Sequence, residues 1–88
     1  MNLNITTRHF EGLTDALRGE VEERIFKLEK FFDRIDEVKV ILTEEKHRHI
    51  VEIAIHLPAG KRLSAREESV DMAAAVELAT KKIEAQVK

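Results

Sequence analysis

The sequence predicts an α+β domain with the element order β-α-β-β-β-α, in which a four-stranded sheet carries both helices on one face. Two stretches, residues 14–34 and 69–88, place apolar residues at helical spacing. Four shorter segments alternate apolar and polar residues, which is typical of strands with one buried face. Such elements bury their apolar sides most simply when both helices cover one sheet face and the other face stays in water.

The first two elements are a short strand and a long helix. Leu3 and Ile5 alternate with polar residues over residues 2–7, which predicts a strand. Thr14 suits the N-cap of the helix, with Asp15 in its first turn. The helix buries a stripe made of Leu17, Val21, Ile25, Leu28 and Phe32. One flank of that stripe is basic, with Arg24, Lys27, Lys30 and Arg34, and the other is acidic, with Glu22, Glu29, Asp33 and the single cation Arg18.

Three further strands and a second helix follow. Alternation predicts strands over residues 36–45, 49–57 and 62–67, with turns at 45–48 and at 58–61 around Pro58 and Gly60. The first two strands are joined through a helix and should be parallel, whereas the last three should form an antiparallel meander. Ser69 suits the N-cap of the last helix. Its buried stripe is expected to contain Met72, Val76, Ala79, Ile83 and Val87.

Composition bounds the class of protein. With 88 residues and 43% hydrophobic content, residues 1–88 should form a single domain with one core. The chain has no cysteine, which excludes disulfides and thiolate chemistry and fits a reducing cytoplasm. Neither a signal peptide nor an apolar run long enough for a membrane span occurs. The net charge of −2 argues against a protein that binds polyanions over its whole surface, but leaves room for a local basic patch.

A search for catalytic and metal-binding patterns predicts a protein that is not an enzyme and holds no cofactor. The two serines, Ser64 and Ser69, lie outside any nucleophile elbow, and no glycine-rich phosphate loop occurs. His47 and His49 would share a face in a strand, but no third ligand accompanies them, since His56 has the opposite parity and His9 is remote. We therefore predict no metal site.

Basic residues on both helices and in one turn form the main functional signal. Nine of the fifteen cations are Arg24, Lys27, Lys30, Arg34, Lys46, Arg48, Lys81, Lys82 and Lys88. If they converge, they would neutralise several phosphates in a salt-dependent manner. The outward strand positions carry no aromatic residue, which favours recognition of folded RNA by shape and backbone over base stacking. Two alternatives stay open: an ordinary solvated surface, or a self-association module that uses Phe26 or the open sheet face.

The chain resembles a known family along nearly its whole length. The stretches that carry the likeness are MNLNIT, TDALRGEVEERIFKLEKFFDRI, HLPAGKRLSAREES and VDMAAAVELATKKIEAQVK. The most specific patterns are ALR…KLEKFFDRI and LPAGKRLSAREESVDMAAA. They are similar to the ribosome hibernation-promoting factor family, which includes protein Y and the sigma-54 modulation protein.

The resemblance implies a β-α-β-β-β-α fold similar to double-stranded RNA-binding domains. It implies a cytoplasmic translation inhibitor that lodges in the decoding cleft of the small ribosomal subunit, contacts 16S-type rRNA, excludes tRNA and mRNA, and silences 70S ribosomes in stationary phase or stress. DNA and membranes are not among the implied partners. The implied phosphate contacts are Arg18, Lys27, Lys30, Lys81 and Lys82, together with Arg8, Lys46 and Lys88.

Three departures from the family pattern bear on these expectations. Ala73 follows Asp71-Met72, where relatives usually have an aromatic residue. The net charge is also more acidic than in short relatives. The chain stops at Lys88, where relatives continue into a basic tail or a second, dimerising domain, so homodimers are expected only through a C-terminal region beyond this sequence.

Overall fold

The computed structural model describes residues 1–87 and has the predicted β-α-β-β-β-α order. The main elements are β1 (Asn2–Arg8), α1 (Asp15–Leu28), β2 (Glu37–Glu45), β3 (Arg48–His56), β4 (Arg62–Ser69) and α2 (Met72–Val87). Two short 3-10 turns, η1 (Glu29–Phe31) and η2 (Pro58–Gly60), complete the chain. Neither helix in this part of the chain is long and apolar enough to span a lipid bilayer.

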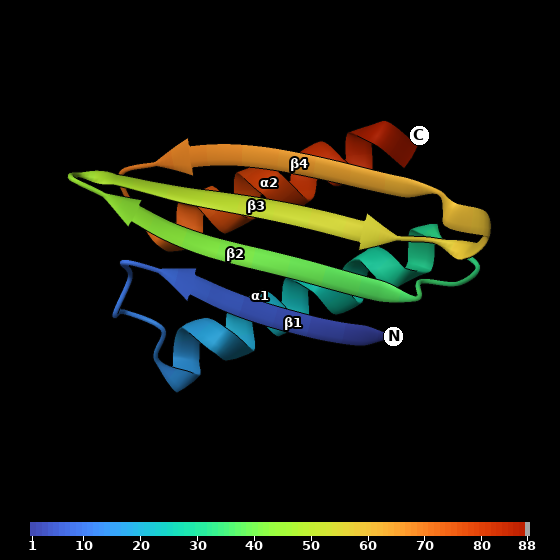
Figure 1. Cartoon of the computed structure of the whole chain (residues 1–88), viewed down its shortest axis with the longest axis horizontal. Coiled ribbons are helices and arrows are strands. Elements are labelled where there is room, and N and C mark those ends of the chain that lie inside the picture. Colours follow the sequence, from blue (N-terminus) through green and yellow to red (C-terminus); the bar gives the residue numbers. More distant parts are fainter. Residues whose placement is uncertain (88) are drawn as a thin grey trace.

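The four strands lie in the sheet in the order β1-β2-β3-β4, so neighbours in sequence are also neighbours in space (Figure 1). β1 is parallel to β2, and the other two pairs are antiparallel, as predicted. The register places Ile5 beside Val40, Val40 beside Ile53, and Ile53 beside Ala65. This row of apolar side chains crosses the whole sheet on one face and forms the floor of the core.

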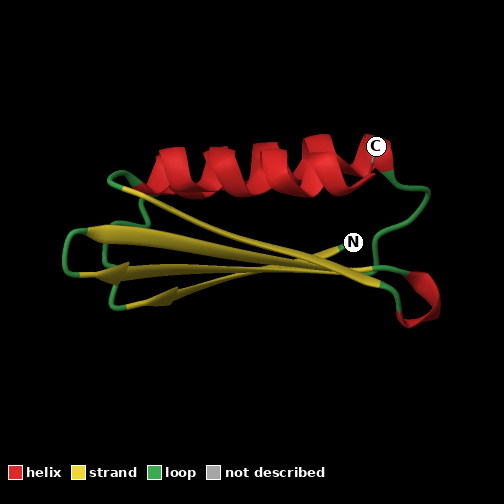
Figure 2. Ribbon diagram, turned by 90° about the horizontal axis from the view of Figure 1, so that it is seen from above, coloured by secondary structure: helices red, strands yellow, loops and turns green. Residues whose placement is uncertain are grey.

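Both α-helices lie on that face of the sheet, and the opposite face is open (Figure 2). Val21 and Ile25 from α1, and Val76 and Ile83 from α2, pack with Ile53 in one buried cluster. α2 covers β3 and β4 and also contacts α1. The helices therefore present their polar flanks side by side, away from the sheet.

The first α-helix is shorter than predicted. It ends at Leu28 and tightens into η1, whereas the sequence pattern extends to residue 34. Phe31 and Phe32 are both partly buried against the core. Adjacent side chains on an α-helix point about 100° apart, so a continuing helix would not direct both Phe31 and Phe32 toward the core. The chain instead leaves the helix and takes an extended conformation at Phe32, where φ is −132°.

The N-cap of α2 also differs from the prediction. Ser69 belongs to β4 and pairs with His49 of β3. Asp71 takes the capping role instead, because its Oδ2 accepts a hydrogen bond of 3.2 Å from the backbone N–H of Ala74. At α1 the predicted cap is correct: Thr14 Oγ1 accepts a hydrogen bond from the backbone N–H of Leu17 at 3.2 Å.

Candidate nucleic-acid interface

The contact line between α1 and α2 holds a chain of charged groups. Arg24 of α1 places Nη2 3.4 Å from Glu20 Oε1 and 3.8 Å from Glu77 Oε1 of α2. The second oxygen of the same carboxylate, Glu77 Oε2, lies 4.0 Å from Lys81 Nζ. Glu77 thus joins one cation from each helix and fixes them as neighbours.

Lys27 extends this cluster along α1. It lies three residues after Arg24, so the two are neighbours on one helix flank. Its Nζ is 3.7 Å from Glu23 Oε1 in a solvent-exposed pair, and the Lys27 and Lys81 side chains are 65% and 68% exposed. We call this cluster the helix seam, which consists of Arg24, Lys27 and Lys81 with the acids Glu20, Glu23 and Glu77. Its two lysines can reach an external polyanion.

The other predicted helix cations lie outside the helix seam. Arg18 is nine residues before Lys27, about two and a half turns, so it is on the opposite flank of α1. Lys82 is on the flank of α2 that faces β4, where its Nζ lies 3.1 Å from Glu67 Oε2. The adjacent lysines Lys81 and Lys82 of α2 therefore lie on different sides of the domain.

The remaining predicted cations are spread further. Lys30 belongs to η1, and its Nζ lies 5.6 Å from the centre of the Phe31 ring. Arg8 ends β1, and Lys46 occupies the β2–β3 turn with φ of 56°. Lys88 lies outside the described residues. The described residues therefore do not form the one continuous positive surface that the sequence suggested. They form the helix seam and several separate cations.

Four members of the helix seam, Arg24 and the three acids, were not among the predicted contacts. Arg24 is half-buried between the helices, and its Nε lacks a hydrogen-bond partner among residues 1–87. Glu77 could be recognised from sequence only as the i,i+4 partner of Lys81. The contact between Glu77 and Arg24 depends on how the two helices pack.

The histidines do not form a metal site within residues 1–87, where no cluster of three suitable ligands occurs. His47 lies in the exposed β2–β3 turn, whereas His49 packs edge-on against Phe10 with ring centres 6.0 Å apart. His49 Nε2 lies 3.7 Å from Glu44 Oε1. Its surroundings are those of a packed side chain rather than of a ligand.

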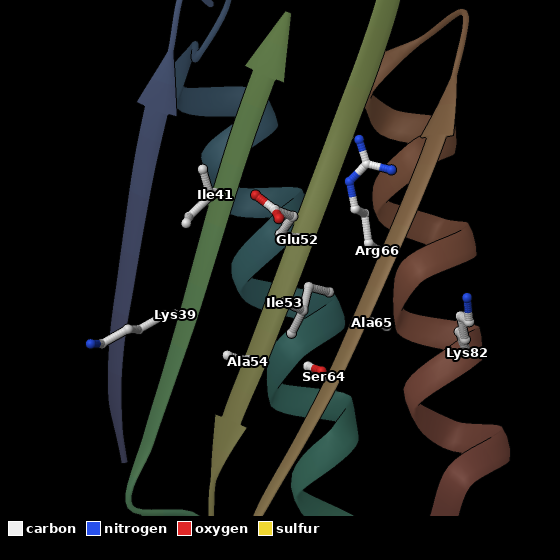
Figure 3. Close-up of a pocket in the computed structure, with 9 residues that line it drawn as sticks. All are labelled: Lys39, Ile41, Glu52, Ile53, Ala54, Ser64, Ala65, Arg66 and Lys82. Carbon is white, nitrogen blue, oxygen red and sulfur yellow. The ribbon is translucent and has the colours of Figure 1, made fainter.

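A shallow depression of about 370 Å³ lies far from the helix seam, over the open sheet face and the edge of β4. Ile41, Ala54 and Ser64 contribute to its lining, and Lys39 and Arg66 flank it. Figure 3 shows that Lys39 extends over β1 while Arg66 extends along β4. The cationic groups of Lys39 and Arg66 thus point away from each other, and these two side chains do not converge on one anion.

Comparison with known proteins identifies relatives over nearly the whole chain. Residues 3–88 match the family model described as Sigma 54 modulation protein / S30EA ribosomal protein. The ribosome hibernation promoting factor of Azotobacter vinelandii is 41% identical over 87 residues, which cover 99% of this chain and 79% of that protein. The ribosome hibernation promoting factor of Escherichia coli K12 is 42% identical over 77 residues, which cover 88% of this chain and 79% of that protein.

Two solved structures share the fold. A ribosomal subunit interface protein from Coxiella burnetii has a TM-score of 0.90 at 29% identity and covers 99% of this chain and 93% of its own. The N-terminal domain of Thermus thermophilus Protein Y has a TM-score of 0.87 at 33% identity and covers 100% of this chain and 97% of its own. The family match, the identities and the shared architecture show that this chain belongs to the Sigma 54 modulation protein / S30EA ribosomal protein family.

Proposed function

We propose that this chain is a ribosome-associated translation inhibitor, and that residues 1–88 form one domain that binds rRNA of the small subunit. In this proposal the domain occupies the decoding cleft and excludes tRNA and mRNA during stationary phase or stress. The names of its relatives, ribosome hibernation promoting factor and ribosomal subunit interface protein, support this assignment. Steric exclusion needs no chemical step, so in this proposal the protein acts by binding alone and without a cofactor. The proposed place of action is the cytoplasm.

The helix seam is the observation that carries the proposal. Lys27 and Lys81 project from neighbouring helices on either side of Arg24. Their ion pairs with Glu23 and Glu77 are long, at 3.7 and 4.0 Å, and exposed to water. Such surface pairs contribute little, at about 0–1 kcal/mol each. Phosphate oxygens can therefore replace the carboxylates with little loss of free energy. The release of condensed counterions drives this exchange.

The scattered cations fit the same proposal. A domain that is lodged in a cleft meets RNA on more than one side. Arg18, Lys82 and the cations Arg8, Lys30 and Lys46 then act as peripheral phosphate contacts around the helix seam. Described strand positions on the open face carry no aromatic residue, so the proposed recognition is of RNA backbone and shape.

The test is sedimentation of the purified chain with small subunits and with 70S ribosomes across a salt series. We expect binding that weakens steeply with salt, because phosphate contacts displace counterions. The Lys27→Glu/Lys81→Glu double variant should bind about 10-fold more weakly or worse, since two attractive contacts become repulsive.

The matched control is Lys39→Glu/Arg66→Glu, which makes the same change of charge on the open sheet face. It should bind much more tightly than the helix-seam variant. Equal losses in both double variants would show that only net charge matters, and salt-independent binding would rule out phosphate contacts.

A further inference from the structure

A groove at one end of the sheet lies between two segments that are far apart in the sequence. Its volume is about 380 Å³. One wall is the chain that follows η1, residues 32–34, and the other is formed by residues of the β3–β4 turn. Figure 1 shows both segments at the right-hand end of the sheet, where η2 forms the tip of that turn. The volume is within the roughly 300–1,000 Å³ that is usual for small-ligand sites.

Main-chain hydrogen bonds fix both walls of the groove. The backbone N–H of Leu57 donates to the carbonyl oxygen of Lys61 at 2.8 Å, which closes the β3–β4 turn. The backbone N–H of Asp36 donates to the carbonyl oxygen of His56 at 2.9 Å, which joins the chain before β2 to the end of β3. The groove therefore exists before any ligand enters, and binding has to order few groups.

The lining of the groove is apolar where it is deepest in the fold. Phe32 and Leu57 are partly buried against the core, and the exposed Pro58 adds a rigid ring beside them. Aromatic and apolar side chains of this kind are surfaces on which a planar nucleobase stacks. The open sheet face has no aromatic residue, but this end of the sheet does.

Two cations line the same groove. The Arg34 side chain is 74% exposed, and its Nε lies 2.8 Å from Asp36 Oδ1. A guanidinium has five N–H donors, so those on its two terminal nitrogens stay available for a phosphate. Lys61 is exposed and forms no ion pair with any of residues 1–87. An apolar lining and two available cations together suit a ligand with a flat ring and a phosphate.

Asp33 is the one acid that lines the groove. It is exposed and forms no ion pair within the described part of the chain. A carboxylate only accepts hydrogen bonds, so it repels a bare anion but binds hydroxyl groups. Ribose offers a 2′-hydroxyl that deoxyribose lacks. The acid therefore favours a ribonucleotide over inorganic phosphate and over a deoxyribonucleotide.

We propose that this groove binds one unpaired ribonucleotide. Its base packs against Phe32 and Pro58. Its phosphate contacts Arg34 and Lys61, and its ribose hydroxyls donate to Asp33. In the ribosome this nucleotide belongs to rRNA, and in that respect the inference rests on the proposed function. Unpaired bases of loops and bulges are the ones that proteins stack on their side chains, so the groove holds a loop nucleotide while the helix seam contacts phosphates.

The test is an NMR titration of the ¹⁵N-labelled chain with adenosine 5′-monophosphate. We expect saturable shifts confined to the amides of residues 32–34 and 59–61, with a dissociation constant on the order of 1 mM. Adenosine and inorganic phosphate each carry only part of the recognised groups and should bind about 3-fold more weakly or worse. The 2′-deoxy nucleotide should bind about 2-fold more weakly or worse, because it lacks one hydroxyl.

A pair of lysine variants separates the groove from general charge. Lys61→Gln should weaken nucleotide binding about 3- to 10-fold, since it removes one charged phosphate contact. Lys39→Gln is the matched control, because it removes the same charge from an exposed lysine on the open sheet face and should leave the affinity unchanged. The same spectra show that both variants are folded. The Lys27→Glu/Lys81→Glu variant should keep wild-type nucleotide affinity although its ribosome binding is reduced.

Four outcomes overturn the inference. They are a wild type without saturable shifts at the groove, equal affinity for the nucleotide and for inorganic phosphate, equal affinity for the ribo and deoxyribo forms, and equal losses in Lys61→Gln and Lys39→Gln. A chain that binds the nucleotide in the groove but does not sediment with ribosomes supports the groove and overturns the proposed function alone.

Discussion

The two faces of the sheet come from the same strands and have opposite properties. On the helix-covered face, Leu42, Ile53 and Ile55 are almost completely buried. On the open face, their neighbours in the same strands, such as Lys39 and Glu52, are polar and contact water. A period of two thus separates the residues that stabilise the domain from those that cover it.

Charged groups follow the same division. In the helix layer, Glu77 holds cations from two elements that meet only in the folded protein. On the open face, cations pair within the sheet, as in Arg48 and Glu68, whose Nη2 and Oε2 are 2.7 Å apart. Hydrogen bonding to Glu68, together with its negative charge, raises the pKa of Arg48. In the helix layer, folding therefore brings cations of two separate helices together around one carboxylate.

The largest expected contrast between the faces is in stability. Ile53→Ala removes a buried side chain beneath both helices and should lower the free energy of unfolding by about 2–5 kcal/mol. Ile41→Ala removes the same atoms from the half-buried open face and should lower it by less than about 1 kcal/mol. Urea denaturation measures both. Similar losses would mean that a partner or a second layer covers the open face.

A smaller effect is expected from the acid in the helix seam. If phosphates replace Glu77 on Arg24 and Lys81, Glu77→Gln should tighten ribosome binding about 2- to 5-fold, since an exposed ion pair is worth about 1 kcal/mol or less. The measurement is the dissociation constant at fixed salt. Glu22→Gln serves as the control, because Glu22 lies on the other flank of α1 and makes no ion pair with residues 1–87. Equal tightening in both variants would reduce the role of Glu77 to net charge.

The smallest effect is expected on the open face. Glu68→Gln breaks the charge pairing with Arg48 but leaves both side chains in water, where 53% of Arg48 and 47% of Glu68 is exposed. We expect the melting temperature to stay unchanged within error, because exposed ion pairs contribute little. A clear decrease in differential scanning calorimetry would show that this pair organises the end of the sheet.

The fold was predictable because its main signals are local. Alternation in residues 36–45 and 49–57 was sufficient to assign most buried positions of β2 and β3, but it missed Ile50, which is buried although it has the opposite parity to Val51 and Ile53. The exceptions lie where tertiary contacts decide. The end of α1 depends on packing both Phe31 and Phe32, and the choice of Asp71 over Ser69 as N-cap depends on how far β4 pairs with β3.

The candidate site was less predictable, because it depends on distances between elements. Helical spacing was enough to put Lys27 on the basic flank of α1 and Arg18 on the other. It could not show that Glu77 of α2 would meet Arg24, or that Lys82 would turn toward Glu67. Convergence of charges from separate elements is a property of packing.

The parallel pairing of β1 with β2 has a consequence for the order of folding. Asn2 pairs with Glu37, with a helix between them, whereas β2 and β3 meet across a two-residue turn. Contacts that close long loops form late, and synthesis releases the N-terminus first. β1 therefore leaves the ribosome before its partner strand exists. Until residue 45 has emerged, both hydrogen-bonding edges of β1 are unpaired. During that time, the small number of apolar residues in β1 is what limits premature association of the nascent chain.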